Sequence, residues 1–440
     1  MIRKNANEKY IKELFETSSS CIEWFGYYNY DVLNKDQTKM LCGQTDFDAR
    51  AITALDTVRL GYYDLQTGTW TQIGKSDSFN WQQGAMLQWL PGEGNESKAI
   101  YNYSDKKSFH AMIVDIATGE ERSLDFPVYC ITPDGRYSIT LKYERSYFCR
   151  AYHYQSVVNE KYDVQIDEED GIFKADLVTN TVERIIPIRK VIEMDPDEDF
   201  ETAKHWLEHI MISPDGTRFV FLHRFTYGIG YQTRLCVADI DGKNLQVVPG
   251  WRTNDWSHFG WNGNDAFAIY SVQKSFSQSK RAKHVQKGQS KMSLRTLLRK
   301  ISNMPGLKQI KGALRRTPNN RYYLTFTLRD GKWEQTGKYD HPLLNIDGHP
   351  SFTADGKYMI TDSYPNKKGF QRLVAYNTHN NQAVLLGEFY APLKGNPASC
   401  DLHPKFCQNE KLVAVDTAYS GTHRMILFEL DWTTIKGAIG

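Results

Sequence analysis

The chain has 440 residues, more than one ordinary globular domain needs, and its formal charge of +2 excludes a strong overall electrostatic field. Aromatic residues make up 13% of it, with 26 Tyr and 10 Trp, a composition that suits many short strands. Seven scattered cysteines without paired-ligand spacing argue against a disulfide framework and favour a reducing compartment.

The N-terminus has no apolar signal core, and no apolar run in the chain reaches the length of a membrane span. We therefore expect a cytoplasmic protein. Residues 5–16 are predicted to form a short amphipathic helix within an N-terminal helical segment, residues 1–19. The apolar side of that helix would carry Tyr10, Ile11, Leu14 and Phe15.

From residue 20 onward, a strand signature recurs in which an apolar run meets an acidic or amide residue and a small loop. We interpret each copy as the outer strand of a four-stranded unit. The copies lie at Asp64, Asp115, Asp176, Asp239, Asp330, Asn377 and Glu429. A repeat of about this length predicts an all-β fold, a seven-bladed β-propeller of four-stranded antiparallel blades over residues 20–440. The strand after Cys21 is a candidate to close the ring beside the last blade.

A second repeat places an Asp-Gly turn between two strand-like runs, which is a strong signal for a β-hairpin. It occurs at Asp134-Gly135, Asp215-Gly216 and Asp355-Gly356, and a degenerate copy follows His403. In three of these four units a histidine stands just before the hairpin. Loops that enter the inner strands of a propeller converge on the central channel, so these side chains are expected to meet there.

Two loops carry residues suited to a glycan, although each also has a purely structural interpretation. The first combines amides with an aromatic ring, which suits sugar hydroxyls or hydrogen bonds between blades; it contains Asn80, Trp81, Gln82 and Gln83. The second can bind a carboxylate through arginine and offer tyrosine as a proton donor, or can be an ordinary loop between strands. It contains Arg145, Arg150, Tyr152, His153 and Tyr154.

An insertion in blade five, roughly residues 274–316, carries 13 Lys and Arg and no acidic residue. A helical face in its second half would carry Leu294, Leu297, Leu298 and Ile301. A basic amphipathic helix is typical of binding to an anionic membrane surface or a partner, and the alternative is a solvated excursion from the propeller. The segment lacks the interleaved aromatics of strand-binding grooves, so we expect no nucleic-acid partner.

Four histidines occupy comparable places at blade entrances: His209, His258, His349 and His403. Asp401 lies two residues before His403 and would share its strand face. His349, Asp401 and His403 form a candidate oxygen–nitrogen site for a divalent metal such as Mn²⁺, Zn²⁺ or Ca²⁺. Alternatively, each histidine hydrogen-bonds a neighbouring blade. His205 and His209 are four residues apart, but they lack the residue order and the helix of a zinc protease.

These motifs together resemble the oligogalacturonate lyase family. The resemblance covers roughly residues 20–440 as repeats, with the specific motifs in 205–425. They are His209 with Ser213–Gly216, Ser257-His258, Gly348–Phe352 and Asp401–Pro404. Members are seven-bladed propellers with a metal held by histidines in the channel. The regions 80–84 and 145–154 look more like propeller-type ulvan lyases, and both groups imply β-elimination on a uronic-acid polysaccharide.

By this resemblance, His349, Asp401 and His403 match metal-site positions and His258 matches the catalytic histidine. The chain departs from the family pattern where Asp401 replaces the first histidine of a His-x-His-Pro motif. It also reads Ala151–Tyr154 where relatives of the second group often read Gly-Tyr-Gly-Tyr, and the basic insertion is not part of the lyase pattern.

Two hypotheses of different class follow. The first is a lyase that acts on an acidic oligo- or polysaccharide. A metal or arginine would stabilise charge at the uronate, while a histidine or tyrosine accepts the C5 proton. Its candidate catalytic residues are His258, His209, Arg150 and Tyr152. The second is a non-catalytic glycan-binding or assembly protein of surface-polysaccharide biosynthesis. Its basic insertion would hold it at the inner membrane surface.

Overall fold

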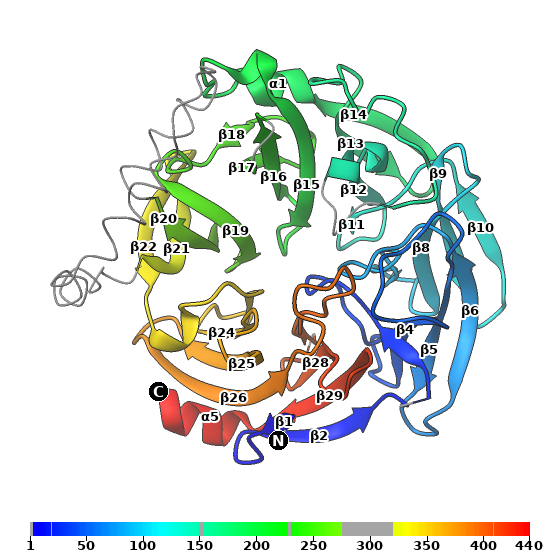
Figure 1. The fold of residues 1–440 in the computed structure, drawn as a ribbon, viewed down its shortest axis with the longest axis vertical. Helices are drawn as coiled ribbons and strands as arrows, with labels where there is room; N and C mark the ends of the chain where they lie inside the picture. The colour runs from blue at the N-terminus through cyan, green and yellow to red at the C-terminus, as the bar shows by residue number, and fades with distance from the viewer. Residues whose placement is uncertain (1–2, 19, 149–153, 228–229, 275–319, 408) are drawn as a thin grey trace, which may run out of the picture.

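The computed structural model describes the whole chain except residues 1–2, 19, 149–153, 228–229, 275–319 and 408. Seven antiparallel sheets stand around a central channel, so the predicted all-β seven-bladed propeller is confirmed (Figure 1). In each sheet the strands follow chain order from the channel outward, except that the last two blades end in a strand from the N-terminal segment. Among the described residues, no helix is both long enough and apolar enough to cross a membrane.

The strands of the first four blades are paired in the order of the chain. Blade one contains β3 (Ile22–Trp24), β4 (Lys39–Thr45), β5 (Val58–Asp64) and β6 (Trp70–Ser76). Blade two contains β7 (Gln88–Trp89), β8 (Lys98–Ser104), β9 (Phe109–Asp115) and β10 (Glu121–Leu124). Blade three contains β11 (Cys130–Ile131), β12 (Tyr137–Leu141), β13 (Gly171–Asp176) and β14 (Thr181–Pro187). Blade four contains β15 (Lys204–Ile212), β16 (Arg218–Thr226), β17 (Gln232–Asp239) and β18 (Gln246–Val247).

Blade five is also paired in chain order, whereas blades six and seven each add an outermost strand from the N-terminal segment. Blade five contains β19 (Asn254–Trp261), β20 (Ala266–Gln273), β21 (Arg321–Arg329) and β22 (Lys332–Tyr339). Blade six contains β23 (Ser351–Phe352), β24 (Tyr358–Asp362), β25 (Phe370–Asn377), β26 (Gln382–Tyr390) and β1 (Lys4–Ala6). Blade seven contains β27 (Lys405–Phe406), β28 (Leu412–Thr417), β29 (Arg424–Leu430) and β2 (Ile11–Glu16). The short helices are η1 (Tyr143–Phe148), α1 (Ile188–Glu193), η2 (Phe200–Thr202), η3 (Pro342–Leu344) and α5 (Trp432–Ile439).

The N-terminal segment is not a helix, so that prediction was wrong. Strand β1 pairs with β26, and β2 pairs with β29 as the outermost strand of blade seven. The open edge of β29 needs a partner, and this long-range pairing outweighs the local apolar spacing that suggested a helix. The ring is therefore closed by β2, whereas β3, the strand after Cys21, begins blade one. Residues 1–19 thus contribute strands to the propeller.

The signature that identified the seven units marks the end of the third strand of each blade and not the outer strand. Asp64 ends β5, for example, and its carboxylate accepts hydrogen bonds from the backbone N–H groups of Gln66 (3.0 Å) and Thr67 (2.9 Å). Asp115 does the same for Ala117 after β9. The acidic residue recurs because it stabilises the turn that leads into the fourth strand.

The Asp-Gly hairpins join the first and second strands of their blades, as predicted, with Gly135, Gly216 and Gly356 at positive φ. The insertion in blade five also has its predicted place, because β20 ends at Gln273 and β21 begins at Arg321. Of the predicted segment 274–316, only Lys274 is described. The helices and lipid-binding face expected there lie outside the described residues.

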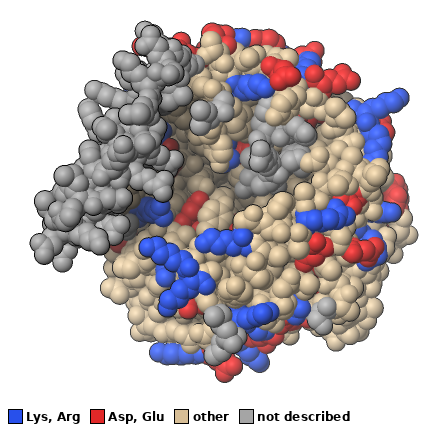
Figure 2. Space-filling model, viewed as in Figure 1, with Lys and Arg blue, Asp and Glu red and all other residues tan. Residues whose placement is uncertain are grey.

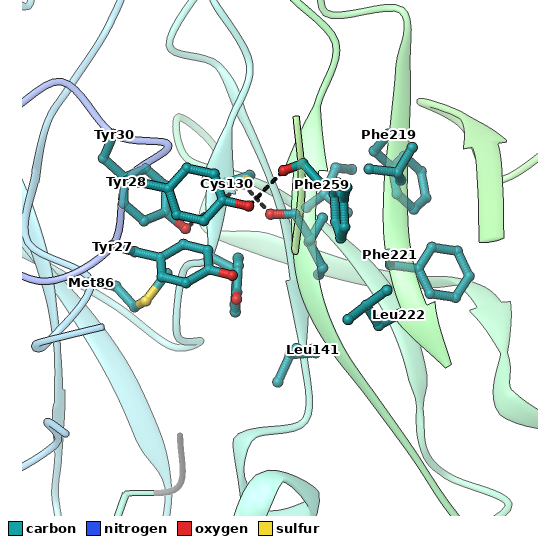
Figure 3. Packing of buried hydrophobic residues seen from close by; sticks show 14 of the residues in the cluster. Tyr27, Tyr28, Tyr30, Met86, Cys130, Leu141, Phe219, Phe221, Leu222 and Phe259 are labelled. Atoms are coloured by element: carbon teal, nitrogen blue, oxygen red, sulfur yellow. Dashed lines mark hydrogen bonds between the residues drawn. The ribbon is translucent and has the colours of Figure 1, made fainter. Parts of the chain in front are cut away.

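The loop that follows β3 enters the channel. Tyr27, Tyr28 and Tyr30 are buried in the main core cluster (Figure 3). The Tyr28 hydroxyl donates a hydrogen bond to the carbonyl oxygen of Phe259 in blade five (2.6 Å). The Tyr30 hydroxyl lies 3.8 Å from the Cys130 sulfur in blade three. A loop of blade one thus crosses the axis of the ring and contacts blades on the opposite side.

Closure by β2 generates a prediction about stability. Ile11 is 2% exposed and Leu14 is 45% exposed, although both lie on β2. We expect Ile11→Ala to lower the free energy of unfolding by about 2–5 kcal/mol, because it leaves a cavity between blades. Leu14→Ala should cost less than about 0.5 kcal/mol. Urea denaturation checks both, and equal costs would contradict the strand assignment.

Candidate metal centre

His349, Asp401 and His403 come together at the channel ends of blades six and seven. His349 stands two residues before β23, and Asp401 and His403 precede β27. One ligand atom from each of the three side chains lies within 4.8 Å of the other two. The two imidazole rings are 4.2 Å apart between centroids. His349 therefore forms one buried cluster with two residues that lie 52 and 54 positions later in the sequence, as the repeat predicted.

The carboxylate of Asp362, the last residue of β24, orients this cluster. It accepts hydrogen bonds from the His349 ring at Nδ1 (2.8 Å), the His349 backbone N–H (2.7 Å) and the His403 backbone N–H (3.1 Å). Gly348 allows the close approach, since a Cβ there would lie 2.0 Å from the Asp362 carbonyl oxygen. Because the Nδ1 proton of His349 is directed at Asp362, its Nε2 carries the lone pair.

The cluster fits a divalent cation. The Nε2 atoms of His349 and His403 are buried without a hydrogen-bond partner among the described residues. Burial lowers the pKa of both histidines, which favours the neutral imidazole that binds metals. Burial, together with the nearby Asp362, raises the pKa of Asp401 to about 7. A cation would satisfy both nitrogens and stabilise the Asp401 carboxylate.

His258 lies beside this cluster and forms a pair with Asp347. Its ring centroid is 4.1 Å from that of His349, and its Nδ1 is 3.1 Å from an Asp347 oxygen. Burial alone would lower the pKa of His258, but the nearby carboxylates of Asp347, Asp401 and Asp362 together outweigh it, so the pKa is raised. Since Nδ1 faces Asp347, Nε2 is the atom left to exchange a proton with a ligand.

His209 reaches the channel from blade four. Pairing shifts register between Glu208 and Met211 in β15, and a similar shift occurs in β19 around His258. Such bulges turn a side chain away from the regular alternation of a strand. The His209 ring lies 6.0 Å from His258 between centroids, and burial lowers its pKa to about 4. All four predicted histidines therefore gather around the channel.

The other predicted site residues are held by hydrogen bonds within the protein or lie outside the described chain. The Gln82 and Gln83 side chains donate to Ser399 and to the Tyr129 hydroxyl, and Asn80 accepts backbone N–H groups of its own loop. These are the inter-blade hydrogen bonds of the structural interpretation. The sugar-binding role of the three residues stays a prediction.

The basic-aromatic loop is also held within the protein. Arg145 is buried and donates to four backbone carbonyls, including that of His205 (2.6 Å). Tyr154 is buried and stacks on Tyr143 with ring centroids 4.8 Å apart. Arg150, Tyr152 and His153 lie outside the described residues, so the catalytic roles of Arg150 and Tyr152 stay predictions.

Sequence reasoning gave no role to three residues that shape the site: Asp362, Asp347 and Tyr28. The Tyr28 ring lies 5.0 Å from His349. Asp362 ends an apolar run as other acidic residues of this chain do, and what distinguishes it is its burial, which only the fold shows. Asp347 and Tyr28 lie in loops, where only the fold shows which side chains meet.

Comparisons with known proteins bear on the fold. No family model matches the chain, and neither does any curated protein. A solved oligogalacturonate lyase in complex with manganese is 15% identical, with 98% of each chain covered and a TM-score of 0.59. The oligogalacturonate lyase of Vibrio parahaemolyticus has the same identity and TM-score, with 98% of this chain and 96% of that chain covered. This chain shares the oligogalacturonate lyase fold. The expected resemblance is thereby confirmed for the architecture.

His205, the fifth histidine considered from the sequence, lies outside the channel in a buried hydrogen-bonded chain. Its Nε2 donates to the Phe200 carbonyl oxygen (2.8 Å), and its Nδ1 accepts from His223 Nε2 (2.8 Å). His223 Nδ1 in turn accepts from Arg234 (2.8 Å). Both histidines are therefore neutral. Burial lowers the pKa of His205 to about 4 and that of His223 well below its usual range.

The hydrogen-bonded chain of His205, His223 and Arg234 predicts that the folded protein loses stability in acid. The unfolded state, with a histidine pKa of about 6.5, takes up protons before the folded state does. The contribution of His205 to the free energy of unfolding is therefore complete above that pH. It is lost as the pH falls towards 4, by roughly 2–3 kcal/mol. The double variant His205→Gln with His223→Gln keeps donors and acceptors but cannot titrate. Its unfolding free energy, from urea denaturation between pH 7 and 4, should depend less on pH than that of the native protein.

The exposed His379 provides the control. His379→Gln should leave the pH dependence unchanged. A double variant with the same acid sensitivity as the native chain would show that the buried histidines do not cause it.

Proposed function

We propose that this protein is a lyase-like enzyme that cleaves a uronic-acid-containing glycan by β-elimination. One observation carries the proposal: a metal-ligand cluster and a His–Asp pair occupy the same channel, with the rings of His349 and His258 4.1 Å apart. Elimination needs a cation near the uronate carboxylate and a proton acceptor beside it. The shared fold with oligogalacturonate lyases supports the same reading.

His349, Asp401 and His403 would hold a divalent ion, and Mn²⁺ is the first choice because one structural neighbour is a manganese complex. When bound, the ion would stabilise negative charge on the substrate carboxylate. Asp362 keeps the His349 ring in the tautomer that binds metal. Asp347 holds His258 in place, so that His258 Nε2 takes the proton from C5 of the uronate.

The electrons of the C5–H bond then form the C4–C5 double bond, and the C4–O bond breaks. The leaving oxygen takes up a proton, and the new chain end is an unsaturated uronide. No oxidant or co-substrate is needed. The burial of His258 and His349 keeps bulk water away from the reacting groups.

The alternative, a non-catalytic glycan-binding or assembly protein at the inner membrane surface, depended on the basic insertion. That segment lies outside the described residues, so the alternative and the cytoplasmic location both stay predictions. Specific binding of acidic glycans without any unsaturated product would favour the non-catalytic alternative.

Metal content tests the ligand assignment. His349→Ala, Asp401→Ala and His403→Ala should each remove most of the bound manganese, because two protein donors are too few for a stable site. His258→Gln should retain it. Asp362→Asn should weaken metal affinity roughly 10–100-fold through loss of ring orientation. Equilibrium dialysis against Mn²⁺ followed by elemental analysis gives the readout.

His423 supplies a matched control, because it is a buried histidine whose Nδ1 contacts a carboxylate, that of Asp48 (2.7 Å), as His349 contacts Asp362. His423→Ala should leave the metal content unchanged. A native protein without stoichiometric manganese would refute the assignment.

Activity tests the reaction class. Acidic oligosaccharides incubated with the manganese-loaded protein should yield 4,5-unsaturated uronides, detected by their ultraviolet absorbance. His258→Gln should lower the rate about a hundredfold or more, because it removes the proton acceptor. A native rate retained in His258→Gln would show that another group takes the proton.

A further inference from the structure

A cavity of about 430 Å³ opens between blades four, five and six. Its wall comes from the segment before β17, the start of β19, the facing ends of β20 and β21, and the loop that leads to β23. Residues in this wall include Tyr231, Trp256, Tyr270, Arg321, Asp347 and Tyr364. In Figure 2 the face shown is hollowed near its centre, with acidic and basic side chains beside the hollow.

The cavity adjoins the reacting groups. Asp347 belongs to its wall and also contacts His258 Nδ1 at 3.1 Å. Tyr364 belongs to the wall as well, and its ring centroid lies 5.7 Å from that of His258 and 5.9 Å from that of His349. A sugar in the cavity would therefore neighbour a sugar held at the metal cluster.

One wall residue has the character of a sugar-stacking platform. Tyr231 is 55% exposed, which is unusual for a large aromatic side chain. Its ring is supported by the Arg224 guanidinium, 4.6 Å from the ring centroid, and by Trp206, 6.0 Å away. A supported and exposed ring offers a rigid apolar face to a pyranose at small entropic cost.

The charges of the wall favour an acidic sugar. Arg321 is exposed at the first position of β21, and a guanidinium binds a carboxylate through two parallel hydrogen bonds. The two carboxylates of the wall each contact a cationic or protonatable group. Asp255 lies 3.3 Å from Lys274 Nζ, and Asp347 contacts His258. Each acidic residue of the wall therefore has a neighbouring group that offsets its negative charge.

Two buried hydrogen-bond donors in the wall point to a ligand rich in oxygen. The Trp256 indole N–H and the Tyr270 hydroxyl have no hydrogen-bond partner among the described residues, and both side chains are more than nine-tenths buried. Buried donors normally have acceptors, and a bound sugar supplies hydroxyl and ring oxygens.

From these observations we infer that the cavity is a uronide subsite next to the site of cleavage. One sugar ring rests on Tyr231, and its carboxylate binds Arg321. This inference rests on the proposed function and deepens it, because it names the residues that select an acidic sugar beside the one that reacts. A neutral oligosaccharide would keep the contact with Tyr231 but would lose the ion pair.

The test uses calorimetric titration of the manganese-loaded full chain with tri-galacturonate, and steady-state kinetics on the same probe. Tyr231→Ala and Arg321→Gln should each weaken binding or raise KM about tenfold, with kcat changed less than about threefold. The effect of Arg321→Gln should shrink in high salt, whereas that of Tyr231→Ala should persist.

Matched controls come from equivalent residues outside the cavity. Tyr162 is 42% exposed and lies 4.7 Å from a supporting Lys204 ammonium, much as Tyr231 lies against Arg224. Arg329 is exposed at the opposite end of β21 from Arg321. Tyr162→Ala and Arg329→Gln should leave the affinity for tri-galacturonate and the kinetics unchanged.

The outcomes separate this inference from the proposed function. Unsaturated product with unchanged KM in Tyr231→Ala and Arg321→Gln would overturn the subsite and leave elimination standing. Binding that both variants weaken, without any product, would support the subsite and contradict elimination. Absence of both binding and product would overturn the two together.

Discussion

The carboxylate of Asp362 is the interaction on which the candidate site depends. Three N–H groups from two blades converge on it: the ring and backbone of His349 and the backbone of His403. A buried carboxylate is costly unless hydrogen bonds replace the lost water, and here these donors do so. The same atoms therefore join blade six to blade seven and set the direction of the His349 ring. The hydrogen bonds of one carboxylate thus stabilise the junction between two blades and orient a candidate metal ligand.

The junction between blades seven and one is also held by a buried carboxylate that accepts backbone N–H groups. Asp416 in β28 accepts the backbone N–H groups of Phe25 and Gly26 (3.1 Å each) and pairs with the buried Lys405. It thereby fixes the start of the loop that places Tyr27 and Tyr28 among the histidines. Buried carboxylates late in the second strands of blades six and seven thus connect successive blades at the channel. The outer circumference is closed separately, by β2.

The sequence was sufficient for the architecture because its signals were local and repeated. The seven copies of the strand-end signature and the Asp-Gly hairpins gave the number of blades, and histidines at equivalent places identified the channel. The sequence did not reveal the strand pairing between segments that lie far apart in the chain. The segment around Ile11 has apolar spacing compatible with a helix, and only the free edge of β29 decides otherwise. Arg145 and Gln83 are side chains suited to a ligand, yet neighbouring blades use their hydrogen bonds. Local sequence does not reveal such partners.

The way the ring closes has a consequence for how the chain is made. Thr17, just after β2, hydrogen-bonds to Met425, 408 residues later in the chain. On the ribosome, β2 emerges about 400 residues before its partner strand β29. During that interval the nascent chain holds an unmatched strand and an open edge, which are the features that promote aggregation. The ring can close only after β29 has been made, so premature termination before β29 would leave a propeller unable to close.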